Sequence, residues 1–216
     1  MSGEYKLDMT MMLTIHDAFR RELDRIAKVA DGVSDDPRTV MRTALGWKLF
    51  KTYLHIHHTS EDDTVWGLME ERLADAPDLA LLHAMEAEHA AIDPLLASID
   101  EALADPEKGA ERLGGLVGDL NSSLRGHLKH EEAEGLSLVD STLTQEEWSR
   151  FAAVHLKKVG EDIGTYMPWL LDDAAADWVE TVLGRLPGWG RVKYEGEWKA
   201  AYDQLSLWTP AAGTAG

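Results

Sequence analysis

The sequence predicts an all-α fold: an up-down antiparallel four-helix bundle with additional C-terminal helices packed on it. Apolar side chains recur at helical spacing along four long segments, and no stretch alternates apolar and polar residues as a strand would. Short breaks separate these segments, so consecutive helices should lie antiparallel. At 216 residues, the chain is long enough for one such core and an extension. The four predicted helices span residues 8–30, 38–73, 78–103 and 108–134.

Local sequence signals mark where these helices begin and end. The break "DGVSDDPRT" follows the first helix and places Asp36 as the N-cap and Pro37 as the first residue of the second helix. The stretches "ADAPD" and "ADPEKG" end the second and third helices. Pro94 lies inside the third helix and predicts a kink or a break there.

The last third of the chain has a different character. The stretch "TQEE", which begins at Thr144, is a capping box that opens a helix to about residue 160, and "GTYMP" interrupts it. Pro168 then starts a helix to about Leu186, "LPGWGR" is a loop, and "EGEWKAAYDQLSLW" forms a last short helix. Six of the eight tryptophans lie here and need a surface to bury against, either the bundle or a dimer face. The predicted divisions are a bundle at 1–140, a packed extension at 141–208 and a disordered tail at 209–216.

Composition argues against several functional classes. The chain has 39 acidic and 21 basic residues, a formal charge of −18, so it should repel nucleic-acid backbones and anionic membranes. It has no cysteine, which removes disulfides, iron–sulfur clusters, thiolate zinc sites and cysteine nucleophiles. No signal peptide and no apolar run of roughly 20 residues is visible, so we expect a cytoplasmic protein without a membrane-spanning segment.

Each predicted bundle helix carries an inward polar residue. His16 lies in the apolar stripe of the first helix, and His89 lies in that of the third. The second and fourth helices each carry a histidine followed four residues later by a glutamate, a spacing that places both side chains on one face, about 5–6 Å apart at Cβ. These pairs are His57 with Glu61 and His127 with Glu131.

A single histidine on an apolar face is more often a hydrogen-bonded core residue than a metal ligand. A cluster of imidazoles and carboxylates inside four apolar stripes is different, because burying it without a partner is costly. The cluster therefore predicts a bound cation. Imidazole and carboxylate without sulfur suit iron, manganese or zinc better than calcium.

Further polar residues on the second helix leave a choice of face. His58 and Asp62 form another pair at the same spacing, but they point about 100° away from His57 and Glu61, so we expect only one pair to face the core. The His57 pair shares its face with apolar residues and is preferred, and the His58 pair then belongs to the polar surround or the surface. Reserve candidates for the site are Glu86, Glu132 and His155.

Four stretches carry a resemblance to a known family: "LTIHDAFRREL", "HIHHTSEDDTVW", "MEAEHAAIDPLL" and "LRGHLKHEEAEGL". They resemble the helices of a hemerythrin-like (HHE cation-binding) domain over roughly residues 8 to 140, and the C-terminal extension is similar to that of actinobacterial members. The resemblance implies two non-haem iron ions, bridged by carboxylates and an oxo or hydroxo group. It implies that the metal ligands are His16, His57, Glu61, His89, His127 and Glu131.

Two departures from the oxygen-carrying hemerythrins affect the expected function. Those carriers have histidine where this chain has Met85, so one iron would lose a nitrogen ligand. Their fourth-helix carboxylate is an aspartate five residues after the histidine, whereas here Glu131 lies at four and Glu132 at five. Four histidines with a glutamate on the fourth helix resemble the iron-sensing domain of a mammalian F-box protein. An open coordination position would favour redox chemistry or sensing over oxygen carriage.

We therefore expect a monomer or homodimer that binds or senses dioxygen, nitric oxide, peroxide or iron. The alternative is a di-iron oxidase, oxygenase or peroxide-consuming enzyme whose extension builds a pocket for a small organic substrate. The third hypothesis is a metal-free or zinc-bound structural bundle.

Overall fold

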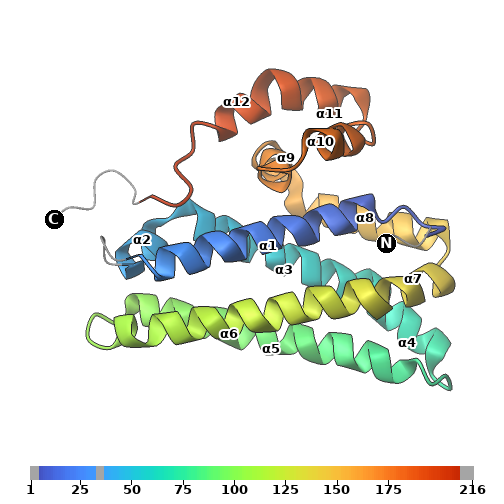
Figure 1. Cartoon of the computed structure of the whole chain (residues 1–216). Coiled ribbons are helices and arrows are strands. Elements are labelled where there is room, and N and C mark those ends of the chain that lie inside the picture. Colours follow the sequence, from blue (N-terminus) through green and yellow to red (C-terminus); the bar gives the residue numbers. More distant parts are fainter. Residues whose placement is uncertain (1–4, 33–36, 210–216) are drawn as a thin grey trace.

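The computed structural model describes residues 5–32 and 37–209, and every regular element in this part of the chain is helical. The four bundle helices are α1 (Thr10–Ala30), α3 (Leu45–Glu61), α5 (Leu79–Ala104) and α6 (Gly109–His130). Successive bundle helices run in opposite directions, which confirms the predicted up-down bundle (Figure 1). α5 continues through Pro94, so the break that this proline could have marked does not occur.

The second predicted helix is divided. α2 (Pro37–Thr43) ends before Ala44, whose backbone is extended, and α3 then starts at Leu45. A contact with a distant segment stabilises this interruption of the helix, because the Gly46 N–H donates to the carbonyl of Leu207 over 2.7 Å. Helical periodicity is a local signal, so it could not predict a break that depends on this long-range contact.

Two bundle helices continue through a π-helical turn at the same end of the bundle. α3 is followed by a π-helical turn at Asp62–Trp66 and then by α4 (Gly67–Leu73). α6 is followed by a π-helical turn at Glu131–Gly135 and then by α7 (Leu136–Thr142). π-helical turns inside α-helices are rare and occur frequently at functional sites. Here each of them adjoins one of the two predicted glutamate ligands.

The extension consists of α8 (Gln145–Val159), α9 (Ile163–Leu171), α10 (Ala176–Leu183), α11 (Gly188–Lys193) and α12 (Lys199–Tyr202). The capping box is confirmed, since Thr144 and Glu147 each accept the backbone N–H of the other. The helix ends at Val159, in agreement with the predicted end at about residue 160, and Gly160 follows it with a φ of 56° that favours glycine. α9 runs through "GTYMP", so the predicted start at Pro168 is wrong, and α11 forms within "LPGWGR", which was predicted as a loop.

The extension covers the side of the bundle that α1 and α3 form, and α5 and α6 lie on the opposite side (Figure 1). Trp169 is fully buried, and its ring lies 5.8 Å from Phe19 of α1 and 4.7 Å from Tyr53 of α3. Lys158 of α8 pairs with Asp63 after α3 over 2.8 Å. α3 is therefore packed on two sides, by its bundle neighbours and by the extension.

Two of the predicted features concern residues outside the described part of the chain. The N-cap at Asp36 and nearly all of the predicted tail at 209–216 lie outside the described residues. The division of the chain at residue 140 stays a prediction. None of the helices in the described part of the chain is long and apolar enough to span a bilayer.

Candidate metal centre

Two groups of side chains with metal-ligand chemistry lie in the bundle core. In each group, one nitrogen or oxygen atom per residue lies within 4.8 Å of the corresponding atoms of the others. The four-residue group consists of His16, His57, Glu61 and Glu131. The three-histidine group consists of His58, His89 and His127. All of these side chains are buried, so each group is a polar cluster enclosed by the apolar stripes of the helices.

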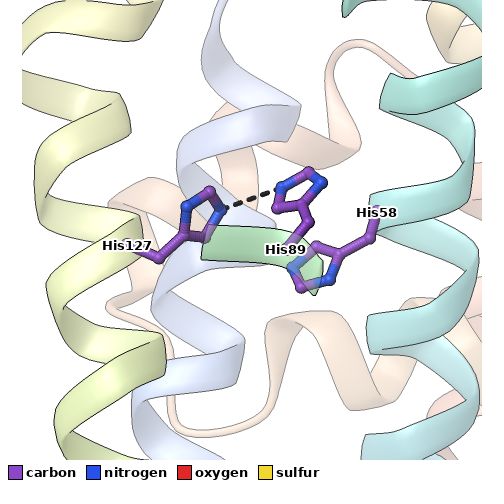
Figure 2. Close-up of side chains that lie close together, drawn as sticks. All are labelled: His58, His89 and His127. Carbon is purple, nitrogen blue, oxygen red and sulfur yellow. Dashed lines mark hydrogen bonds between the residues drawn. The ribbon is translucent and has the colours of Figure 1, made fainter. Parts of the chain in front are cut away.

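The three-histidine group brings together rings from α3, α5 and α6 (Figure 2). The rings of His58 and His89 stack with their centroids 4.0 Å apart, and the His127 ring meets His89 edge-on at 4.6 Å. The Nε2 atoms of His89 and His127 are 3.0 Å apart, the contact that the dashed line marks in Figure 2.

Two carboxylates lie between the groups. The Oε1 atom of Glu61 is 3.4 Å from Nε2 of His57, and its Oε2 atom is 3.4 Å from Nε2 of His89. One carboxylate thus faces an imidazole of each group. Glu131 is placed similarly, since its Oε2 atom is 3.2 Å from Nε2 of His16 and 3.8 Å from Nε2 of His127.

Three of the histidines are oriented by an outer carboxylate. Nδ1 of His16 lies 2.9 Å from Glu132, Nδ1 of His89 lies 3.2 Å from Asp62, and Nδ1 of His127 lies 3.0 Å from Glu88. A carboxylate at Nδ1 keeps the proton on that nitrogen and leaves Nε2 as the ligand atom, which is the usual arrangement around a metal-bound imidazole. Arg20 also pairs with Glu132 over 2.8 Å and anchors it.

This orientation makes the contact between His89 and His127 informative. If both rings carry their proton on Nδ1, the Nε2 lone pairs of these two rings point at each other across 3.0 Å. Two lone pairs repel at that distance, so the pair needs either an extra proton or a cation between the two nitrogens. The chemistry of the donor atoms therefore fits a cation.

Unpartnered buried atoms fit a cation as well. In the two groups, these atoms are His16 Nε2, both ring nitrogens of His57, His58 Nε2, and both carboxylate oxygens of Glu61 and of Glu131. Each buried polar atom without a partner costs about 1–3 kcal/mol. A metal ion coordinated by these nitrogens and oxygens would remove most of that cost at once.

The electrostatics of the residues alone leave the core short of positive charge. Burial, reinforced by the charge of Glu131, raises the pKa of Glu61 well above its usual range. Burial and the neighbouring imidazoles lower the pKa of His57 and of His58 well below theirs, so both rings are neutral at pH 7. Burial opposes a charge on His16, but the carboxylates of Glu131 and Glu132 outweigh it and raise the pKa of His16 to about 9. The neutral rings of His57 and His58 are in the state in which an imidazole binds a metal.

The structure brings together the six residues that the sequence singled out, and it adds a seventh. The expectation that His58 belongs to the polar surround is wrong, because its side chain is buried, stacks on His89 and belongs to the three-histidine group. Asp62, its partner in the pair, is half exposed and orients His89 from outside. His57 and His58 therefore both face the core, one toward each group.

The double packing of α3 explains this result. A helix at the surface of a bundle buries one stripe, so neighbouring residues 100° apart cannot both be inside. On α3, the ring of His58 meets His89 and His127, whereas the ring of His57 meets Phe151 and His155 of α8 at 6.4 and 6.2 Å. The sequence did contain a signal for this arrangement, since His57 and His58 are each followed four residues later by an acidic residue. That signal predicts two inward pairs only if the extension is known to cover α3.

The reserve candidates have other positions. Glu86 is exposed and belongs to neither group, and Glu132 contacts His16 at its outer nitrogen. His155 is buried beside His57, and its Nε2 is 2.9 Å from the hydroxyl of Tyr166. Met85 is buried and belongs to neither group, and His58 brings the number of imidazoles in the two groups to five.

A buried set of imidazoles and carboxylates inside an antiparallel four-helix bundle defines the chain as a metal-binding helical protein. The hemerythrin HHE cation-binding domain matches residues 8–139, so the chain belongs to the hemerythrin family. The match ends before α8, and the extension that packs against His57 follows it. Searches among curated proteins and among solved structures gave no match.

Proposed function

We propose that the two groups hold a pair of non-haem iron ions and that the protein binds or senses dioxygen, nitric oxide, peroxide or iron at this centre. The observation that carries the proposal is the position of Glu61, whose two oxygens face imidazoles of different groups at the same distance of 3.4 Å. A carboxylate in that position suits two ions side by side. Nitrogen and oxygen donors without sulfur favour iron or manganese for such a pair.

Some residues would bind the metal ions, and others orient these ligands or exclude water from the centre. The five histidines of the two groups, Glu61 and Glu131 would provide the donor atoms, while Glu132, Asp62 and Glu88 fix the orientation of three rings. Bound iron supplies a redox couple and a coordination position for a small ligand. Phe19 and Phe151 lie 5.5 and 6.4 Å from the His57 ring and keep water away from that side of the centre.

Metal analysis combined with an absorption spectrum tests the proposal. Protein purified in air should contain iron and show the charge-transfer bands of a bridged ferric pair, and a reversible spectral change under oxygen and vacuum would identify binding. Zinc at full occupancy without iron would refute the proposal and leave a structural bundle. His57→Ala should lower the iron content, and His83→Ala, which changes an exposed histidine outside both groups, is the matched control.

An apolar cavity favours a second function, catalysis on a small organic molecule. The cavity has a volume of about 220 Å³ and lies between α1, α8, α9 and the segment before α11. Its walls are almost entirely apolar, and they include Ile15, Phe151, Met167 and Leu186. Phe151 and His155 form one wall of the cavity and also contact His57. A single layer of aromatic side chains therefore separates the cavity from the four-residue group. Apolar cavities with few polar groups are typical of small-molecule sites.

Peroxide consumption separates the two functions. An enzyme should consume peroxide continuously when a small phenol or alcohol is added, and Ala152→Trp, which fills the mouth of the cavity, should abolish that stimulation while the iron content is unchanged. A stoichiometric and reversible spectral change that no organic compound alters would contradict catalysis and support binding.

A further inference from the structure

A second cleft, on the opposite side of α3, leads to the three-histidine group. It has a volume of about 280 Å³ and lies between α3 and α5. Its lining residues are His55, His58, Thr59, Asp62, Glu86, His89, Ala90 and Asp93. Two of them, His58 and His89, belong to the three-histidine group, so the cleft connects solvent with the buried centre.

The charge of this cleft sets it apart from others on the molecule. Its walls carry three carboxylates, Asp62, Glu86 and Asp93, and no lysine or arginine. Four other clefts in the described residues, of 210 to 400 Å³, each have at least one arginine or lysine on their walls. An acidic wall alone is common on a chain with a charge of −18, but among those five clefts only this one has no lysine or arginine among its lining residues. The ammonium of Lys158 reaches the edge of the cleft, where it donates to Thr59 and is paired with Asp63.

Pro94 removes a backbone donor next to the cleft. Proline has no backbone N–H, so the carbonyl of Ala90, four residues earlier in α5, lacks its helical donor. Ala90 lines the cleft. Carboxylate and carbonyl oxygens are the groups that replace water around a divalent cation in transit.

An imidazole nitrogen without a hydrogen-bond partner lies at the inner end of the cleft. His58 is 94% buried, since its relative exposure is 6%, and its Nε2 atom has no hydrogen-bond partner. A cation that moves inward along the cleft therefore meets an unpartnered nitrogen at its end.

We propose that this acidic cleft is the route by which a divalent cation, Fe²⁺ in the first instance, reaches the buried centre, and that Glu86 and Asp93 attract it. The inference rests on the proposed function, because it requires that the centre takes up iron. It assigns a role to two exposed acids that hold no place in either group.

Uptake kinetics test this route directly. Metal-free protein is mixed with Fe²⁺ without oxygen, and tryptophan fluorescence reports arrival, since the Trp66 ring lies 6.2 Å from the ring of His89. The final iron content is measured on the same samples. Uptake by the unaltered protein should slow as ionic strength rises, because salt screens the attraction.

Introducing a positive charge into the cleft is the most direct test of the route by mutation. Ala90→Lys places a positive charge on an exposed position of the wall, and Ala90→Met is its uncharged match in size. A unit charge about 8 Å from the path of a divalent ion changes the rate about fivefold in water. We expect Ala90→Lys to slow uptake at least fivefold, Ala90→Met to leave it unchanged, and both proteins to reach the same final iron content.

Neutralising the wall should act in the same direction. Glu86→Gln combined with Asp93→Asn should slow uptake, whereas Glu107→Gln combined with Glu111→Gln, which removes the same charge at the far end of α5 and α6, should not. If the cleft variants load iron at the unaltered rate, the route is wrong and the proposed function stands. A loss of final iron content in proportion to the rate would place the effect at the centre and also overturn the route. If the unaltered protein takes up no iron, the proposed function fails, and the route fails with it.

Discussion

Replacing His58 with alanine tests the main point on which structure and sequence pattern disagree. The sequence pattern predicts no effect on metal content, because it places His58 outside the core. The structure places the ring in the three-histidine group with His89 and His127, so its loss should leave two nitrogens there. The prediction concerns one group only, since the four-residue group keeps all its side chains.

The magnitude follows from the number of donors. Structural zinc sites with four protein ligands bind the ion with about 10–16 kcal/mol, about 3 kcal/mol for each ligand, and we take the same share for each ligand here. At 1.4 kcal/mol for each factor of ten, removing one ligand lowers the affinity of that ion about a hundredfold. In the metal-free protein, the loss of the stacked ring is offset by removal of an unpartnered buried nitrogen, so the free energy of unfolding should change by less than about 2 kcal/mol.

Two measurements on one set of samples provide the assay. Metal analysis after gel filtration gives the ions retained per chain, and calorimetry of metal-free and iron-loaded protein gives the increase of the melting temperature on loading. His58→Ala should lose about half of the retained iron and a large part of the increase, while the metal-free melting temperature stays close to that of the unaltered protein. His55→Ala is the control, because His55 is exposed on the same helix and belongs to neither group.

Unchanged iron content and an unchanged increase of the melting temperature in His58→Ala would refute the reasoning. The site would then consist of the residues found from the sequence alone, and the burial of His58 would be a packing feature. An equal loss in His55→Ala would also count against it, because the effect would then come from the acidic cleft that both residues line.

Three further predictions concern the contacts around the bundle. Gly46→Ala should displace Trp208, because a Cβ atom there would lie 2.4 Å from its indole ring, so tryptophan emission should shift to the red, with no shift expected in Gly126→Ala, where space is open. Glu22→Ala should lower the free energy of unfolding by about 3 kcal/mol in urea, because this buried carboxylate pairs with two arginines and accepts from the Trp208 indole; a loss below about 1 kcal/mol would contradict it. The guanidinium of Arg72 holds the pKa of Glu147 at about 2, below its usual value of 4.5, so the carboxylate stabilises the fold above pH 4.5 and this contribution is lost as the pH falls from 4.5 toward 2. Acid unfolding of Glu147→Gln should lack that part of the pH dependence, and an identical acid transition would contradict it.

The parts of the fold that could be predicted are those fixed by local signals. The bounds of α1 and α5 agree with the predicted ones to within two residues, because an amphipathic period and flanking turn residues determine them. The pairs His57 with Glu61 and His127 with Glu131 could be found for the same reason, since their spacing is a property of the helix itself.

The parts that could not be predicted depend on contacts between distant segments. The break at Ala44 involves Leu207, and the orientation of His127 involves Glu88 of another helix. α9 passes through Pro168 because the ring of Trp169, its neighbour, is packed against the bundle, which outweighs the local preference for a break. None of these partners has a fixed spacing in the sequence.

The double packing of α3 gives the centre two different sides, and this difference has a functional consequence. On the side of the extension, His57 lies under Phe151 and beside an apolar cavity, which favours an uncharged molecule over a hydrated ion. On the side of α5, His58 lies at the end of a cleft whose lining includes three carboxylates and no lysine or arginine, where we expect the preference to be reversed. His57 and His58 are adjacent on α3 and point about 100° apart, and neighbouring helices cover α3 in both directions. The two side chains therefore face the two different environments. It follows that metal uptake and ligand binding should respond to different variants: a charge at Ala90 should slow the first and leave the second unchanged in protein that is already loaded.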